Sequence, residues 1–89
     1  MQEAFKALSD PTRREILRLL GAGPRTVTDI VGQFELSQPA ISRHLGVLRQ
    51  AGLVSAERNG QSVFYALDTT VFQDVVRALL SLRKGRNSR

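Results

Sequence analysis

The chain has 89 residues, a formal net charge of +5 and no cysteine, which is enough for one small domain with a limited core. The absence of cysteine excludes disulfides, thiolate metal sites and cysteine nucleophiles. No apolar run resembles a signal peptide or reaches membrane-spanning length, so we expect a cytoplasmic protein.

The positive charge is concentrated at the carboxyl end of the chain. Four of the thirteen basic residues lie in residues 83–89, which contain no acidic residue. Residues 1–82 are almost neutral, with nine basic and eight acidic side chains. We therefore expect one domain over residues 1–82 and a basic, frayed tail over residues 83–89.

Two helices are predicted at the amino-terminal end. The first spans residues 3–8 and carries Phe5 and Leu8 at i, i+3 spacing. Asp10 is a candidate cap for the second helix, because Pro11 follows it. Proline suits the first helical position, since the N–H that it lacks would have no hydrogen-bond partner there. The second helix has one apolar face and is terminated by the Gly-Ala-Gly-Pro segment that follows it.

The next segment, residues 26–51, predicts two amphipathic helices joined by a tight turn. Thr26 is the expected cap of the first helix, with Asp29 completing an approximate capping box. Ser37 is the expected cap of the second helix, which has a proline in its first turn and is closed by Gly52. The expected apolar face of the first helix consists of Val27, Ile30, Val31 and Phe34.

The second helix of this pair has an apolar stripe that faces the core and an outward face without large aliphatic side chains. On a helical wheel the core-facing stripe consists of Ile41, Leu45 and Leu48. The outward face consists of Pro39, Ser42, Arg43, Gly46, Arg49 and Gln50. A DNA-recognition helix places its amino-terminal residues at base edges, where Gln pairs with adenine, Arg with guanine and Ser with either. This surface is typical of such a helix, and the alternative is an ordinary solvated face.

After this helix the pattern changes from a helical period to alternation. Residues 53–58 and 61–67 predict two strands joined by Asn59-Gly60, a strong hairpin signal because both residues accept positive φ. Arg58 at the hairpin tip is suited to a phosphate or minor-groove contact. A last helix starts near Asp68, and its apolar band consists of Phe72, Val75, Val76, Leu79, Leu80 and Leu82.

The order of these elements predicts a mainly α fold with a β-hairpin wing, a winged helix-turn-helix of order α-α-α-α-β-β-α. Across residues 2–82 the chain resembles the ArsR/SmtB family of small bacterial transcriptional repressors. The matching stretches are FKALSDPTRREIL, LSQPAISRHLGVLRQAGLV and ERNGQSVFYAL. Within this family FKALSDPTRR and LDTTVFQD look most like the SdpR-type autorepressors, whose relatives lack metal ligands.

The resemblance implies a homodimer that is held by its first and last helices, binds a pseudo-palindromic operator and represses transcription. The residues favour the same assembly, because a small domain cannot bury all of its apolar end-helix side chains alone. The alternative is that both end helices pack only on their own core. The expected interface consists of Phe5, Leu8, Phe72, Val75, Val76, Leu79, Leu80 and Leu82.

The expected DNA contacts fall into three groups. Base edges are assigned to Gln38, Ser42 and Arg43, and phosphates mainly to Ser37, His44, Arg49 and Arg58. Further contacts are expected from Pro39, Ala40, Asn59, Gly60 and Gln61. A winged helix that binds protein instead of DNA is the rival interpretation, but such a module needs exposed aromatic or aliphatic anchors at the helix centre.

Metal sensing is common in the family, and this chain departs from that pattern. Where many relatives carry a cysteine pair the chain has TVTDIV, and in the last helix only Asp68 and Asp74 are available. One histidine, His44, and scattered carboxylates do not make a transition-metal site, so we expect no metal and no cofactor. Relief of repression must then come from a partner protein, a small ligand or dilution, and the SdpR-type resemblance implies sequestration by a membrane protein.

Catalysis is not expected from these residues. Ser42 and His44 point about 200° apart on a helix, so they do not form a nucleophile-base pair. The chain has no Walker loop, GxGxxG or HExxH motif and no paired-carboxylate spacing.

Overall fold

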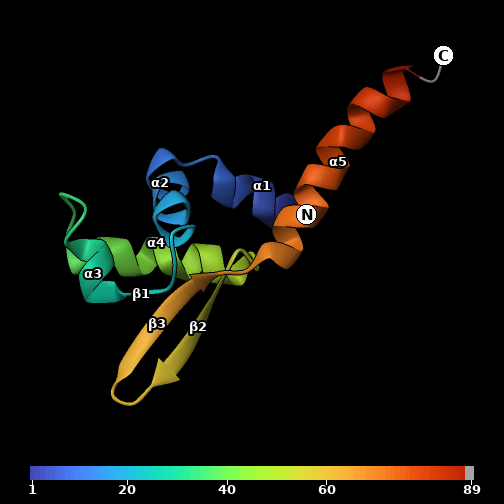
Figure 1. The fold of residues 1–89 in the computed structure, drawn as a ribbon. Helices are drawn as coiled ribbons and strands as arrows, with labels where there is room; N and C mark the ends of the chain where they lie inside the picture. Colours follow the sequence, from blue (N-terminus) through green and yellow to red (C-terminus); the bar gives the residue numbers. More distant parts are fainter. Residues whose placement is uncertain (88–89) are drawn as a thin grey trace.

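The computed structural model describes the backbone of residues 1–87 and the side chains of residues 1–83. In this part of the chain the helices are α1 (Gln2–Leu8), α2 (Pro11–Leu20), α3 (Val27–Val31), α4 (Gln38–Gln50) and α5 (Thr69–Asn87). The strands are β1 (Arg25–Thr26), β2 (Val54–Asn59) and β3 (Ser62–Leu67). Figure 1 shows α1 and α2 above α4, with the β2–β3 wing projecting on one side and α5 leaving on the other. The predicted fold class, mainly helical with a β-hairpin wing, is confirmed.

Side-chain caps start α2, α3 and α4 where the sequence predicts them. The Arg13 N–H donates to the Asp10 carboxylate over 3.0 Å, and the Asp29 N–H donates to Thr26 over 3.2 Å. The Ala40 N–H donates to the Ser37 hydroxyl over 3.3 Å. Each bond satisfies an amide that has no partner within its own helix, so a cap from the neighbouring sequence contributes to each of the three helix starts.

The core lies between α2, α4 and the base of the wing. The predicted inner stripe of α4 is fully buried, with Ile41 and Leu48 at 0% and Leu45 at 1% exposure. The other buried apolar residues are Ala4, Ala7, Ile16, Leu17, Leu20, Ile30, Leu53, Val54 and Val75. Since burial of one Leu or Ile side chain stabilises a fold by about 1.5–3 kcal/mol, this cluster fixes the orientation of α4 in the domain.

Helix α3 is shorter than the apolar pattern predicts. It ends at Val31, and the backbone is not helical again until Gln38. Phe34 was expected on the helical face, but it lies in the loop and packs partly buried against the core. Spacing alone cannot distinguish an apolar residue on a helix from one that a loop carries back to the same core.

The hairpin is confirmed, but its turn lies one residue further along than Asn59-Gly60. Asn59 pairs with Ser62, so Gly60 and Gln61 form the loop. Gly60 has φ +68°, and no described residue other than glycine has positive φ. Glycine at the first loop position is the pattern of a type II′ turn. This register places Val54 opposite Leu67, so apolar residues face each other at the base of the wing.

A third strand, β1, joins the wing and was not predicted. The sheet order is β1-β3-β2, and Arg25 pairs with Tyr65 while Thr26 pairs with Phe64. Thr26 therefore ends the strand and also caps α3. This pairing ties the base of the wing to the start of the helix-turn-helix.

Helix α5 extends beyond the rest of the domain (Figure 1). Val71, Phe72 and Val75 near its start pack on the core, whereas every described residue from Leu79 to Arg83 is exposed. The radius of gyration is 14.8 Å, above the value of about 12 Å for a compact chain of this length. The predicted domain end at residue 82 falls inside α5, and residues 88–89 of the predicted tail lie outside the described residues.

No helix in residues 1–87 is both long enough and apolar enough to span a bilayer.

Candidate nucleic-acid interface

Helix α4 presents the expected base-contacting side chains to solvent. Gln38, Ser42 and Arg43 are all exposed, while the opposite side of the helix is buried in the core. Arg43 has no salt bridge within the described residues, so its guanidinium keeps its donors for a ligand. An exposed Gln and Arg near the start of one helix provide bidentate donors and acceptors that match base edges in the major groove.

The residues around this surface have mixed accessibility. Ser37, Pro39 and Arg49 are exposed, and Ala40 is half-buried. Ser37 accepts the Ala40 N–H as a cap, which leaves its hydroxyl hydrogen able to donate to a phosphate. The amino-terminal end of α4 thus has a hydroxyl donor and the positive end of the helix dipole at one place.

His44, an expected phosphate contact, lies close to the start of α2. Its Nδ1 atom is 3.3 Å from Nη1 of Arg13 and 4.0 Å from Oδ2 of Asp10. The side chain is only 22% exposed and faces the start of α2. Nδ1 of His44 is therefore directed at α2, which packs beside that side of α4, and the expected phosphate contact is left to Nε2.

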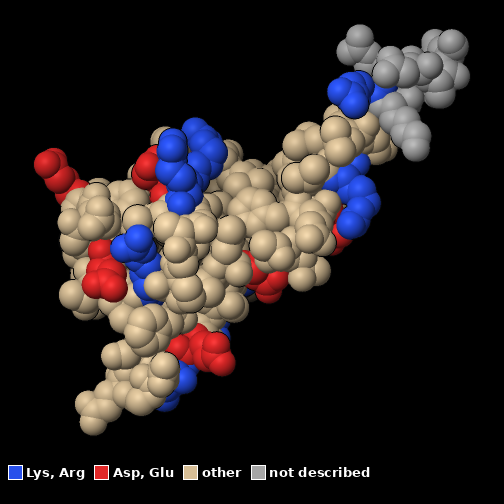
Figure 2. Space-filling view, in the orientation of Figure 1, with Lys and Arg blue, Asp and Glu red and all other residues tan. Residues whose placement is uncertain are grey.

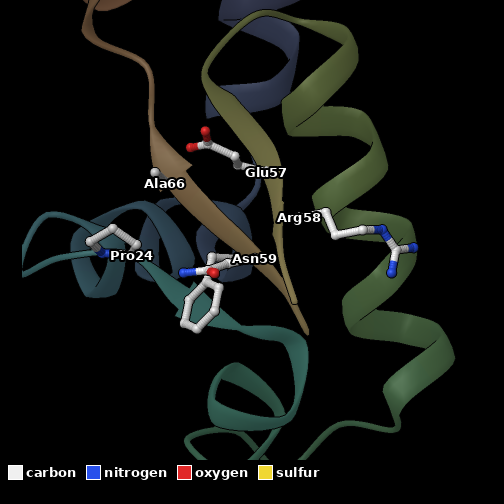
Figure 3. Close-up of a pocket in the computed structure, with 6 residues that line it drawn as sticks. Pro24, Glu57, Arg58, Asn59 and Ala66 are labelled. Carbon is white, nitrogen blue, oxygen red and sulfur yellow. The ribbon is translucent and has the colours of Figure 1, made fainter. Parts of the chain in front are cut away.

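The wing tip is exposed at every expected contact residue, namely Arg58, Asn59, Gly60 and Gln61. Because side chains alternate along a strand, Arg58 shares a side of the sheet with Val54, which is buried against the core. Figure 3 shows Arg58 extending away from Glu57 and Ala66. Its guanidinium therefore lies on the side of the wing that faces α4.

The opposite side of the wing holds an open pocket of about 610 Å³. Figure 3 shows the residues that line it, which are Pro24, Glu57, Arg58, Asn59, Phe64 and Ala66. The Arg58 side chain points away from this pocket. The two sides of the wing therefore differ in chemistry, with Arg58 on one side and Glu57 on the other.

Helix α1 borders part of the exposed face of α4, which sequence patterning did not predict. An open groove of about 520 Å³ between the two helices is lined by Glu3, Lys6, Ala7, Arg43, Gly46, Val47, Gln50 and Ala51.

In the view of Figure 2, basic side chains form small separate groups with acidic side chains near most of them. On the face seen in this view, acidic side chains therefore partly balance the basic ones, as expected for residues 1–82, which are almost neutral.

The expected dimer residues divide into two groups. Val75 is 5% exposed and belongs to the core of the protomer, because α5 packs on the domain at that point, so it offers little surface to a partner. Leu8 and Phe72 are partly buried against the same core. The remaining five are exposed, at 41–68%, and are Phe5, Val76, Leu79, Leu80 and Leu82.

Among the described side chains, no three His, Cys, Asp or Glu residues gather where they could hold a metal ion.

Sequence reasoning missed one residue that lies close to the expected DNA contacts. Arg13, on α2, contacts His44 across a sequence separation of 31 residues. No local signal could have revealed this contact, because it depends on how α2 packs against α4.

The amino-acid sequence matches the family model of bacterial regulatory proteins of the arsR family over residues 10–56. It is similar to the transcriptional repressor SdpR of Bacillus subtilis (strain 168), with 49% identity over 88 residues, 98% of this chain and 98% of the relative. It is also similar to an arsenical resistance operon repressor of Staphylococcus aureus, with 35% identity over 75 residues, 84% of this chain and 72% of the relative.

A solved structure with a similar fold is that of an ArsR-like transcriptional regulator from Rhodococcus sp. RHA1. Its TM-score is 0.89 at 30% sequence identity, and the match covers 99% of this chain and 83% of that one. The chain therefore belongs to the arsR family of bacterial regulatory proteins.

Proposed function

We propose that this chain is a transcriptional repressor that binds a double-stranded DNA operator sequence-specifically as a homodimer. The observation that carries the proposal is the exposed start of α4, where Gln38, Ser42 and Arg43 lie opposite a fully buried stripe. The similarity to SdpR, which is named as a transcriptional repressor, supports repression over activation.

The contacts have separate roles in this proposal. Gln38 and Arg43 read base edges with help from Ser42, because amide and guanidinium groups can form paired hydrogen bonds with single bases. Ser37, Arg49 and Arg58 fix the position of the protein on phosphates. His44 contributes only through Nε2, since Nδ1 is directed at α2. Pro39, Ala40 and the wing residues 59–61 supply surface contacts around these groups.

The homodimer is supported by the exposed apolar surface on α5 and α1. Val76, Leu79 and Leu80 are each more than half exposed, and they fall on one side of α5 at helical spacing. Phe5 on α1 is exposed as well, and α1 contacts α5. An apolar surface of this kind on a small domain is stabilised by burial against a second copy, and two-fold symmetry places the two recognition helices about one DNA turn apart.

The signal that relieves repression is proposed to be something other than a transition metal. The chain has no cysteine and one histidine, and that histidine already contacts Arg13. The staphylococcal relative is named for arsenical resistance, whereas the name of the Bacillus relative mentions no metal. We propose that a partner protein or a small ligand fills this role, and that the chain has no catalytic activity.

Selection of binding sites from random double-stranded DNA tests this function. The proposal expects recovery of an inverted repeat whose half-sites are centred about 10 base pairs apart, one helical turn of DNA. The matched control is the Gln38→Ala, Arg43→Ala double variant, which should recover no consensus while still binding DNA weakly through phosphates. Recovery of the same repeat by the double variant would reject the assigned base contacts, and recovery of no repeat by the unaltered chain would reject the function.

A further inference from the structure

The side chain of Arg13 joins three helices. Its Nε atom donates to the Ala7 carbonyl over 2.8 Å, and Nη2 donates to the Lys6 carbonyl over 3.3 Å, both at the end of α1. Its Nη1 atom lies 3.3 Å from Nδ1 of His44 on α4. Arg13 itself belongs to α2. One guanidinium therefore connects the helix that lies beside α5 with the helix that carries the predicted base contacts.

This contact fixes the position of the proton on His44. A guanidinium has five N–H donors and no acceptor, so Nδ1 of His44 must accept the hydrogen bond from Arg13. A neutral imidazole that accepts at Nδ1 carries its proton on Nε2. No hydrogen bond within the described residues uses Nε2, and no buried side-chain nitrogen or oxygen there lacks a partner, so Nε2 reaches solvent. His44 then presents a donor outward.

Asp10 offers His44 an alternative partner. Its Oδ2 atom is 4.0 Å from Nδ1 of His44, and the same oxygen already accepts the Arg13 backbone N–H over 3.0 Å. Without the Arg13 guanidinium, a proton on Nδ1 would be attracted by this carboxylate. Nε2 would then have no hydrogen to donate. Arg13 and Asp10 therefore favour opposite tautomers of one ring, and the shorter contact belongs to Arg13.

We propose that Arg13 is a positioning residue for operator binding, which fixes α4 against the end of α1 and holds His44 as the Nε2–H tautomer that donates to a DNA phosphate. The proposal rests on the DNA-binding function above. Its physical basis is that a phosphate accepts hydrogen bonds and cannot donate them, so only one of the two neutral tautomers binds it. The link to α1 also limits rotation of α4 relative to α1 and α5, the two helices of the proposed dimer interface.

The tautomer can be measured without DNA. His44 is the only histidine of the chain, so the ring ¹⁵N signals of the uniformly labelled protein belong to it alone. At about pH 8, where an ordinary imidazole is neutral, the proposal expects the Nε2–H pattern. In Arg13→Met, which keeps an unbranched side chain and removes the donors, the signals should shift toward Nδ1–H. A predominant Nδ1–H form in the unaltered chain, or no shift in Arg13→Met, would overturn the proposal.

Arg14 supplies a matched control. Its Nη1 atom donates to the Leu8 carbonyl over 2.7 Å, so it also ties α2 to the end of α1, but it does not contact His44. Arg14→Met should therefore leave the His44 ring signals unchanged. Equal changes in the two variants would mean that the tautomer follows a general loosening of α1, which would overturn the specific role of Arg13.

Operator binding tests the second half of the proposal. Arg13→Met should weaken binding to DNA from upstream of the chain's own gene by about tenfold, the size of one net hydrogen bond. The glutamine amide in His44→Gln always carries an N–H donor, so its donation to a phosphate does not depend on a tautomer. In this background Arg13→Met should therefore weaken binding no more than Arg14→Met does. An equal loss from Arg13→Met with and without His44→Gln would overturn the tautomer role.

The outcomes separate this proposal from the function itself. An unaltered chain that shows no preference for any operator rejects the function, and with it any role of Arg13 at DNA. Specific binding that Arg13→Met leaves unchanged rejects only the role of Arg13. Circular dichroism of each variant confirms that folded protein is compared, and the ring signals of the unaltered chain test the tautomer even if Arg13→Met does not fold.

Discussion

Gly52 and Val71 lie so close together that a β-carbon on Gly52 would be 2.9 Å from Cγ2 of Val71. Gly52 also has φ +80°, a backbone conformation that L side chains rarely adopt. It follows the end of α4, and Val71 lies in the first turn of α5. This contact therefore sets how the start of α5 packs beside the end of α4.

We expect Gly52→Ala to lower the free energy of unfolding by about 2–5 kcal/mol, because positive φ costs a non-glycine residue about 1–2 kcal/mol and overpacking costs about 1–3 kcal/mol. Gly46 is the matched control, since nothing lies within 4 Å of a β-carbon there and α4 is regular. Gly46→Ala should stabilise the fold by up to about 1 kcal/mol through helix propensity. Urea unfolding at one protein concentration measures both variants, and equal midpoints would contradict the close packing at Gly52.

Arg43 and Arg58 should differ in what they contribute to DNA binding. Arg43→Ala should cost about 1–3 kcal/mol in operator affinity and reduce the preference for operator over scrambled DNA, because the guanidinium is expected at a base edge. Arg58→Ala should weaken binding to both DNAs alike and reduce the salt slope by about 1. Fluorescence anisotropy with both DNAs at several salt concentrations distinguishes these effects.

The reverse pattern would contradict the assignment. Suppose that Arg43→Ala weakens binding to both DNAs equally while Arg58→Ala removes the preference for operator over scrambled DNA. The wing would then read the sequence, and α4 would fix the position of the protein on the DNA. Gln50→Ala is a control on the same helix, because Gln50 is exposed but lies at its carboxyl end, away from the expected base contacts. Its affinity should stay close to that of the unaltered chain.

Leu79 tests the proposed dimer interface. This side chain is 51% exposed in the protomer, so Leu79→Glu should leave the fold intact while placing a charge in the interface. We expect the dimer to weaken by about 2 kcal/mol or more, since burial of one Leu contributes that amount and an unpaired carboxylate resists burial. Sedimentation velocity measures the dissociation, and operator affinity should fall with it.

Ser81→Glu adds the same charge to α5 at an exposed position about 200° from Leu79. It should leave both the dimer and operator binding unchanged. An unaltered sedimentation coefficient for Leu79→Glu would show that the apolar face of α5 is not the interface.

Asp10 predicts a pH dependence of stability. The hydrogen bond from the Arg13 backbone N–H lowers the pKa of this carboxyl below its ordinary value of 3.8, outweighing an opposing effect of desolvation, and the charges of Arg13 and His44 act in the same direction as the hydrogen bond. A lowered pKa in the folded state means that the ionised form stabilises the fold above pH 3.8, and that this contribution is lost as the pH falls below it.

The comparison variant is Asp10→Asn, because asparagine caps a helix about as well as aspartate but carries no charge. The unaltered chain should be the more stable of the two at about pH 6, and the difference should shrink steadily toward about pH 2. Urea unfolding across this range measures it. A difference that stays constant with pH would show that the carboxylate charge does not contribute.

The features that the sequence predicted correctly are local ones. The caps at Asp10, Thr26 and Ser37 each bond an amide three residues away, so a short window of sequence contains both partners. The inner stripe of α4 was predicted for the same reason, because helical spacing alone places Ile41, Leu45 and Leu48 on one side.

The features that were missed depend on contacts between distant segments. β1 exists only because Arg25 and Thr26 pair with β3. The orientation of His44 depends on α2, and the burial of Val75 depends on where α5 meets the core. The hairpin turn is an intermediate case. Gly60 was correctly expected in the turn, but Asn59 pairs with Ser62, so the second loop residue is Gln61 and not Asn59.

Sequence-selective DNA binding is the property on which the proposed function depends most. A gel-shift titration with DNA from upstream of the chain's own gene, alongside a scrambled DNA of equal length and composition at rising salt, measures it directly. The proposed function predicts at least about 10³-fold tighter binding to the operator, with a preference that persists as salt weakens both complexes. Weak binding that disappears equally from both DNAs would contradict it and would favour a winged helix that binds protein instead.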